Sequence, residues 1–182
     1  MIPHPLLRKI SITLIVLINL HFIVGIKTTV DEYPLGNIGR DALKSYNRGE
    51  MAKAEALLDE GDALYFSSKV WRRISLDHGD CYSYTNKSNT IRGRLALVDG
   101  DLAQAKTYLE KSAKINRSSS YSAFGPNMSL ANDLLAKGET QAVFAYFDAC
   151  KLFWSYGSDR MDDWEAQINK GQRPDFGGNM MY

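Results

Sequence analysis

The side chains best suited to chemistry in the body of the chain stand close together at His78, Asp80 and Cys81. An imidazole, a carboxylate and a thiol within a few residues are groups that bind zinc or support nucleophilic catalysis. A closed zinc site needs about four ligands, however, and the Asp-His-Gly-Asp of residues 77–80 is equally typical of a turn. We therefore expect no catalytic residue, no metal and no cofactor. A small metal-binding or hydrolytic protein built on this segment is the alternative.

The two cysteines of the chain, Cys81 and Cys150, could form one disulfide if the domain lies outside the cytoplasm. Cys150, however, stands at a repeated position where two other segments of the chain have Gly61 and Ser112. We expect Cys150 to be a buried thiol that fills space, with the disulfide as the alternative.

Four arginines form the clearest local excess of positive charge in the domain: Arg72, Arg73, Arg92 and Arg94. Arginines beside aromatic residues supply strong contacts in many protein interfaces. Because Arg92 and Arg94 are two residues apart, they point to different sides of a helix and cannot both face the centre of one groove. Solvated helix faces are therefore the alternative interpretation of these arginines.

Length and charge limit the kinds of protein that the chain can be. Its 182 residues leave room for one compact domain and an appendage. The 22 Lys and Arg residues against 21 Asp and Glu give a formal net charge of +1, so no global field draws the chain to nucleic acid. We expect no nucleic-acid partner.

The amino terminus has the pattern of a membrane anchor. Arg8 and Lys9 precede an almost unbroken apolar run over residues 10–26, which as a helix would be about 25 Å long, near the roughly 30 Å of a bilayer core. No good small-x-small cleavage site follows, so we expect an uncleaved single-pass anchor with its amino terminus in the cytoplasm. The domain would then lie in the periplasm or the extracellular space. Secretion after signal cleavage and a buried helix of a soluble domain are the alternatives. The chain divides into a signal or anchor segment (1–29), a linker (30–36) and a helical domain (37–182).

Three segments of the domain repeat one pattern around Gly49, Gly100 and Gly138. Each has a small residue seven before the glycine and an acidic residue directly after it. A short aliphatic, a bulky apolar and a small residue follow at five, nine and twelve positions after the glycine. A glycine can take the left-handed conformation that ends a helix, and an acid favours the start of the next. The pattern therefore predicts three helical hairpins that pack through these positions. The positions are Ala42, Ala54, Leu58 and Gly61; Gly93, Ala105, Leu109 and Ser112; and Ala131, Val143, Phe147 and Cys150.

This pattern of small, glycine, acidic, small, bulky and small residues resembles the tetratricopeptide repeat. The resemblance implies paired helices stacked into a solenoid with a concave protein-binding face. The second and third units match best, whereas the early aromatic residue and the closing proline of the family are absent. The glycines are 51 (100 − 49) and 38 (138 − 100) residues apart, against about 34 in the family. We interpret the extra length, around residues 66–86, as an additional helix or an elaborated loop.

Beyond the third unit, the spacing of Met161, Trp164 and Ile168 predicts a capping helix over residues 159–170 that ends at Gly171. The tail should fold back on the domain, because it ends in large apolar residues. Its Pro-Asp-Phe-Gly (174–177), with Phe-Gly-Pro-Asn (124–127) upstream, is similar to segments of membrane-anchored or exported bacterial repeat proteins. That similarity implies no particular activity.

Together these features predict an all-α fold, a short solenoid of about three tetratricopeptide-like hairpins with a carboxyl-terminal capping helix, preceded by a hydrophobic anchor helix. The function they favour is non-catalytic binding of a protein or peptide partner by a membrane-anchored module. A self-associating secreted structural subunit is a further alternative. By the resemblance, first-helix residues line the groove, and the candidates are Lys44, Tyr46, Asn89, Arg92 and Asn132.

Overall fold

The computed structural model describes residues 35–75, 81–114 and 124–180, and the regular structure in these ranges is helical, with no strand. A helix over residues 35–47, here called the first helix, opens the described chain. It is followed by α2 (Met51–Ser75), α3 (Cys81–Val98), α4 (Leu102–Ala113), α6 (Ser129–Leu135), α7 (Thr140–Lys151) and α8 (Ser158–Asn169). Short 3-10 helices, η1 (Ser155–Gly157) and η2 (Gly177–Met180), precede α8 and close the tail. The predicted all-α class is confirmed.

The predicted membrane anchor over residues 10–26 lies outside the described residues. Among the helices that are described, none is both long enough and apolar enough to cross a membrane.

The same turn joins the two helices of each repeated segment. Gly49, Gly100 and Gly138 have φ angles of 77°, 80° and 81°, in the left-handed region. At each turn the glycine N–H donates to the carbonyl three residues earlier, and the N–H of the following acidic residue donates to the carbonyl five residues earlier. This pair of bonds is the Schellman motif, which satisfies carbonyls at the end of a helix. The second bond runs from Glu50 to Ser45, from Asp101 to Ala96 and from Glu139 to Leu134. The predicted glycine turns are confirmed.

The twelve aligned small and bulky positions of the repeats are all buried. The need for a small residue is steric at two of them. A Cβ atom on Gly61 would collide with the ring of Tyr84, and one on Gly93 would collide with the side chain of Leu130. Larger residues would therefore push neighbouring helices apart, as the pattern predicted.

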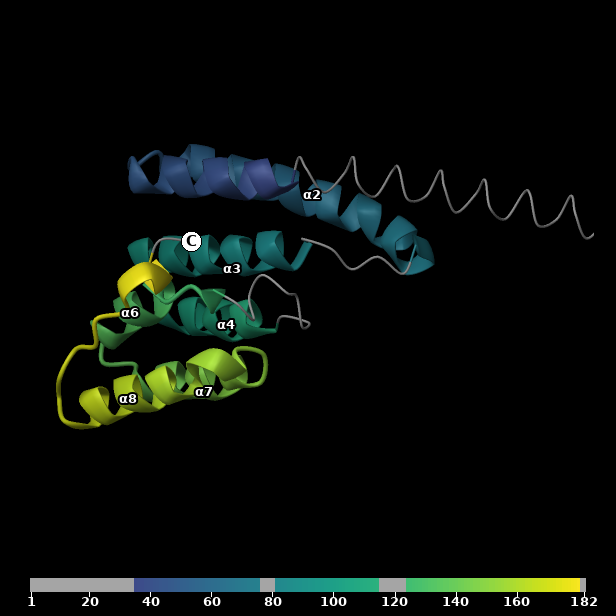
Figure 1. Cartoon of the computed structure of the whole chain (residues 1–182). Helices are drawn as coiled ribbons and strands as arrows, with labels where there is room; N and C mark the ends of the chain where they lie inside the picture. The colour runs from purple at the N-terminus through teal and green to yellow at the C-terminus, as the bar shows by residue number, and fades with distance from the viewer. Residues whose placement is uncertain (1–34, 76–80, 115–123, 181–182) are drawn as a thin grey trace, which may run out of the picture.

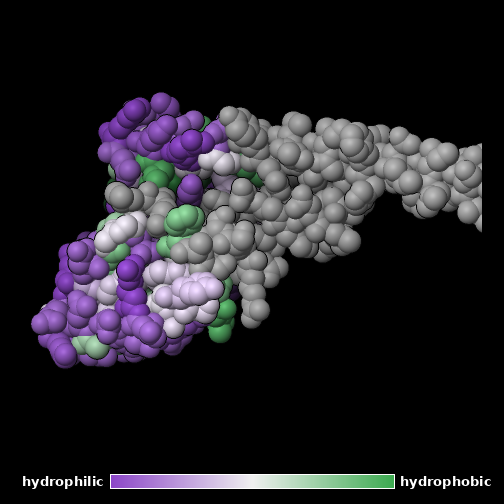
Figure 2. Space-filling view, in the orientation of Figure 1, coloured by the Kyte–Doolittle hydropathy of each residue, from purple (hydrophilic) through white to green (hydrophobic). Residues whose placement is uncertain are grey.

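The helix pairs lie in layers (Figure 1). The first helix and α2 form the upper layer in that view, and α3 packs between α2 and the pair α4 and α6. Below them, α7 packs on α4 and α6, and α8 packs on α7. The outer surfaces of the upper layer and of the lowest layer are mostly hydrophilic (Figure 2).

The extra length between the first two repeats extends two helices. Contrary to our interpretation, α2 continues unbroken for 25 residues to Ser75, and α3 begins at Cys81 and runs for 18 residues. The interpretation was wrong because residues 62–75 contain no glycine or proline, so nothing ends α2 soon after Gly61.

The helix predicted over residues 159–170 is present as α8. It buries Met161 and Trp164, and the turn that follows it contains Gly171, whose φ of 73° belongs to a fourth Schellman motif. On the outer side, Lys151 Nζ lies 2.6 Å from Asp162 Oδ1 and so ties α7 to α8.

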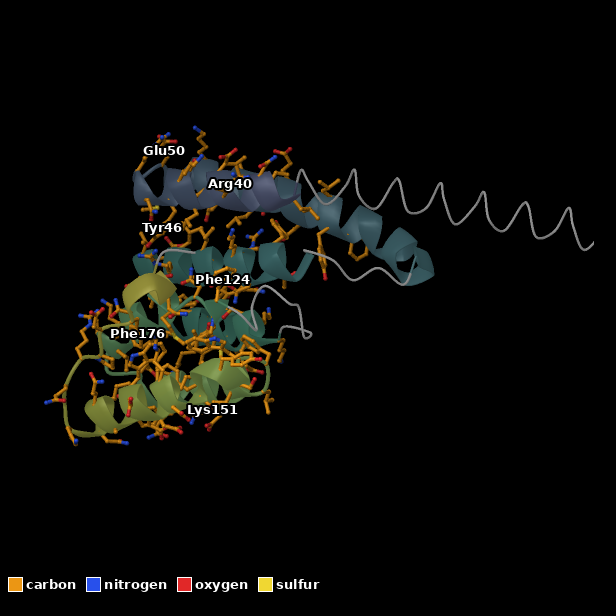
Figure 3. All side chains as sticks on the ribbon, in the orientation of Figure 1. Arg40, Tyr46, Glu50, Phe124, Lys151 and Phe176 are labelled. Carbon is orange, nitrogen blue, oxygen red and sulfur yellow. The ribbon has the colours of Figure 1, made fainter. Side chains whose placement is uncertain are left out.

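The predicted return of the tail is also confirmed. The ring of Phe176 is buried, with its centroid 4.9 Å from that of Trp164 (Figure 3). The side-chain amide nitrogen of Asn179 donates to the backbone carbonyls of Phe124 at 3.2 Å and Pro126 at 3.0 Å. The backbone carbonyl of Asn179 accepts from the backbone N–H of Met128 at 2.8 Å. The tail is thus bonded to the chain that leads into α6.

Candidate functional site

A polar cavity of about 440 Å³ lies between α2, α3 and α4. Two of the five predicted groove residues, Asn89 and Arg92, line this polar cavity. The other lining residues are Asp62, Tyr65, Tyr84, Thr85, Ser88, Tyr108 and Lys111. The cavity therefore combines aromatic rings with hydrogen-bonding groups of both kinds and with both signs of charge.

Arg92 is fixed in the wall of the polar cavity by two carboxylates of α2. Its Nη2 atom lies 2.9 Å from Asp59 Oδ1 and 2.7 Å from Asp62 Oδ2. The two aspartates can share one guanidinium because residues three apart lie on the same side of a helix. Burial lowers the pKa of Arg92, but the two carboxylates raise it by more, so the net shift is upward. Both contacts use one terminal nitrogen, and a guanidinium has three further N–H groups that can bond a ligand.

Tyr84 is a buried residue of the lining of the polar cavity. Its hydroxyl lies 2.8 Å from the carbonyl oxygen of Leu58, to which it donates, and 2.9 Å from Asp62 Oδ1. Burial raises the pKa of Tyr84 above its ordinary range, and the hydrogen bond and negative charge of Asp62 raise it further. At neutral pH this phenol stays protonated and joins α3 to α2 rather than acting as a base.

A second cavity of about 420 Å³ lies one repeat further along, between α4 and α7. Its lining is dominated by alanines, namely Ala103, Ala113, Ala142, Ala145 and Ala149. At its edge, Lys106 Nζ lies 2.8 Å from Glu139 Oε2. Most of the polar cavity's lining comes from α3, whereas the alanine-lined cavity is lined by α4 and α7 alone, so the two cavities differ in both position and chemistry.

Arg94 faces a different side of α3 from Arg92, as their spacing predicted. Its Nε atom lies 2.7 Å from Asp133 Oδ2 on α6, and its guanidinium lies 4.6 Å from the ring centroid of Tyr46. Tyr46 accordingly lies between the first helix and α3 (Figure 3). This candidate groove residue takes part in packing the first two layers and is remote from the polar cavity.

The last two candidate groove residues lie in further separate places. Lys44 is exposed and pairs with Asp41 on its own helix at 3.3 Å. The Asn132 side-chain oxygen accepts from Nε of Arg173, in the tail, at 2.9 Å. Of the five candidates, the structure therefore brings together only Asn89 and Arg92.

Sequence reasoning missed the partners that surround these two residues, above all Asp59, Asp62 and Tyr84. The sequence does carry one relevant signal, the spacing of Asp59 and Asp62. Two aspartates three residues apart lie on the same side of a helix, where both can contact one arginine. Nothing in the sequence, however, shows which arginine some 30 residues later meets them.

The metal-binding or hydrolytic site that the sequence offers as an alternative falls on residues whose side chains lie outside the described part of the chain. His78 and Asp80, and the side chain of Cys81, lie outside it. No group of three histidine, cysteine or carboxylate side chains suited to a metal ion occurs among the residues that the structure describes. Cys150 is a free thiol with 0% exposure, and burial raises its pKa, so its expected packing role is confirmed.

No family model, curated protein or solved structure matches this chain.

Proposed function

We propose that this chain is a membrane-anchored module that binds a protein or peptide partner through tetratricopeptide-like hairpins on the non-cytoplasmic side of a membrane. Residues 10–26 serve as the anchor, and the domain performs no catalysis. The partner contact in this proposal is centred on the polar cavity.

The observation that carries the proposal is the repetition of one hairpin. Three helix pairs share the same Schellman turn and bury the same small and bulky positions. Helical hairpins that repeat in this way form stacks whose side surfaces are long and exposed, and such stacks commonly serve protein binding. The repetition supports a short solenoid with α8 as its cap.

The polar cavity supports recognition of an extended peptide. Arg92 is held by Asp59 and Asp62 before any ligand arrives, so little side-chain entropy remains to be lost on binding. The amide of Asn89 and the ammonium of Lys111 add directional polar contacts at the cavity wall. Aromatic rings and arginine are the side chains that most often dominate protein interfaces, and both are present here.

Site-specific photo-cross-linking of the full-length protein in its native membrane tests the proposal. A photoreactive amino acid replaces Asn89 in the polar cavity, and the matched control replaces Lys44, an exposed polar residue outside it. We expect one covalent adduct of defined mass from position 89 and none from position 44. Lys111→Glu should weaken the adduct at position 89, because it reverses a charge at the cavity wall.

Two outcomes would count against the proposal. Equal adducts at positions 89 and 44 would remove the polar cavity as the contact site. Adducts only between two copies of the chain would favour the self-associating subunit instead.

A further inference from the structure

The polar side chains of α3 lie on two opposite sides of that helix. Thr85, Asn89 and Arg92 line the polar cavity, and at about 100° per residue their positions fall within about 60° of one another. Position 94 falls about 180° from position 85, and Arg94 accordingly contacts the ring of Tyr46 on the first helix. The polar cavity therefore lies on the side of α3 that is turned toward α2 and α4, opposite to the side that meets the first helix.

The first-helix side of the stack, formed by the first helix, α6 and the Arg94 side of α3, has its central polar residues paired with one another. Arg94 is bonded to Asp133 on α6. Arg173, in the tail, donates to the side-chain oxygen of Asn132 at 2.9 Å and to its backbone carbonyl at 3.2 Å. A partner on this side would have to replace these contacts, which would reduce its binding free energy.

The second-helix side is the surface formed by α2, α4 and α7, which follow one another down the stack (Figure 1). The polar cavity lies between α2 and α4, and the alanine-lined cavity lies between α4 and α7. Lys111 lines the first cavity and Thr107 lines the second, and both are exposed. Because residues four apart are neighbours on a helix surface, the two cavities flank one exposed face of α4.

The polar cavity offers cationic donors to a ligand. Asp62, the carboxylate of the described lining, is already bonded to Arg92 and to the hydroxyl of Tyr84. The ammonium of Lys111 lies 5.2 Å from the ring centroid of Tyr108 and forms no ion pair among the described residues. Arg92 uses one terminal nitrogen for both of its aspartates, which leaves its other N–H groups for a ligand. The group that complements these donors is a carboxylate.

The alanine-lined cavity offers apolar surface and a volume of about 420 Å³. The charges at its edge are balanced, because Lys106 and Glu139 pair with each other at 2.8 Å. The group that fits this cavity is an apolar side chain, since burial of apolar area is favourable. A helix with its side chains is about 10–12 Å across, and an extended chain advances about 3.3 Å per residue. Three or four residues of a partner therefore span the distance from one cavity to the other.

We infer that the second-helix side holds the partner as an extended segment, with the carboxylate of an Asp or Glu side chain in the polar cavity and an aliphatic or aromatic side chain, three or four residues away, in the alanine-lined cavity. This inference rests on the proposed function, whose contact site it shares. It adds the chemistry of the partner and the direction in which the partner crosses α4.

The test selects ligands from a display library of short random peptides, with the full-length protein in detergent micelles as bait and empty micelles as the subtraction. We expect the selected peptides to share Asp or Glu and, three or four positions away, Leu, Ile or Phe. A synthetic peptide of the selected consensus is then titrated against variants of the protein by fluorescence anisotropy.

Lys111→Glu should weaken binding of this peptide at least about fivefold, because it places a like charge beside the peptide carboxylate. Ala145→Trp, at an exposed position of α7, should weaken it at least about tenfold, because the indole fills the alanine-lined cavity. The matched controls are Lys53→Glu and Ala56→Trp, at exposed positions of α2 outside both linings, and they should leave the affinity unchanged.

A consensus without an acidic residue, or an affinity that either cavity variant leaves unchanged, would overturn the inference. The proposed function would survive that result, because a peptide would still be bound. Enrichment of no peptide over empty micelles would also overturn it. The photo-cross-link at position 89 then separates the two claims, because an adduct there keeps the proposed function and its absence contradicts both.

Discussion

Equivalent hairpins are joined by different chemistry at the two ends of this molecule. Between the upper layer and α3, the described buried apolar residues form two small groups, of four and two residues. The joint is completed by polar contacts of Arg92 and Tyr84. From the end of α3 to the tail, a single group of seventeen buried residues is continuous and rich in aromatic rings. The aligned repeat positions thus determine the structure of each hairpin. The residues between these positions determine how strongly successive hairpins are packed together.

The two joints should therefore differ in the free energy needed to separate them. Burial of apolar area contributes roughly 25 cal/mol per Å², whereas partly exposed ion pairs contribute about 0–1 kcal/mol each. We therefore expect the first helix and α2 to separate from α3 more readily than α7 and α8 separate from α6.

The largest effect should come from Trp164→Ala. Trp164 is 4% exposed, and its ring lies within 6.2 Å of those of Trp154, Phe147 and Phe176. Removing a buried indole should lower the free energy of unfolding by about 3–5 kcal/mol. Urea denaturation of the detergent-solubilised chain measures the loss. Tyr156→Ala, at a side chain that is 90% exposed, serves as the control and should change stability by less than about 0.5 kcal/mol. A loss of similar size in both variants would contradict the comparison.

Tyr84→Phe should have an intermediate effect, because it removes one hydroxyl from the polar joint and leaves the ring. We expect a loss of roughly 1 kcal/mol at neutral pH. The pKa of Tyr84 is raised in the folded state, so above pH of about 10 the unfolded chain releases a proton that the folded chain retains.

Stability therefore falls as the pH rises from that point, by up to about 1.4 kcal/mol per pH unit for this group. Urea denaturation between neutral and alkaline pH should show a shallower decline in Tyr84→Phe than in the parent. Parallel declines would show that Tyr84 does not titrate as its surroundings indicate.

The smallest effect should come from Arg92→Met, which keeps the stem of the side chain and removes its charge. Asp59 and Asp62 are largely exposed and return to water, so the expected loss is below about 1 kcal/mol. Native-state hydrogen exchange locates this loss. Amides of α2 should exchange faster, while those of α7 keep the parent rate. Faster exchange in α7 as well would mean that the two regions open as one unit.

The local features of the fold could be predicted from the sequence. A glycine followed by an acid has a specific backbone consequence, and Gly49, Gly100 and Gly138 all adopt it. The buried positions follow from the same alignment, because helical periodicity converts spacing into a face. The helix α8 follows from the same periodicity, whereas the return of the tail was expected from its large terminal apolar residues and is in fact made by Phe176 and Asn179.

The candidate site could be predicted only in part, because it depends on contacts between distant residues. Asn89 and Arg92 were identified as groove residues of a first helix, but the cavity that they line is completed by residues of α2 and α4. One lining residue, Tyr84, has its ring against Gly61, 23 residues earlier (84 − 61), where a Cβ atom would collide with it. Contacts between residues so far apart in the sequence cannot be predicted from the spacing of residues within one helix.

At the three hairpin turns glycine is required because of its positive φ, and not because space for a side chain is lacking. A Cβ atom added at Gly49, Gly100 or Gly138 would have no neighbour within 4 Å. L-alanine would nevertheless be strained there by about 1–2 kcal/mol, because its Cβ lies on the wrong side of the backbone for a positive φ. D-alanine, the mirror-image residue, would fit the same φ and restrict the unfolded chain, adding about 0.4–1 kcal/mol of stability at each turn. The three hairpin turns thus depend on the absence of an L-configured Cβ at these positions, and not on a shortage of space.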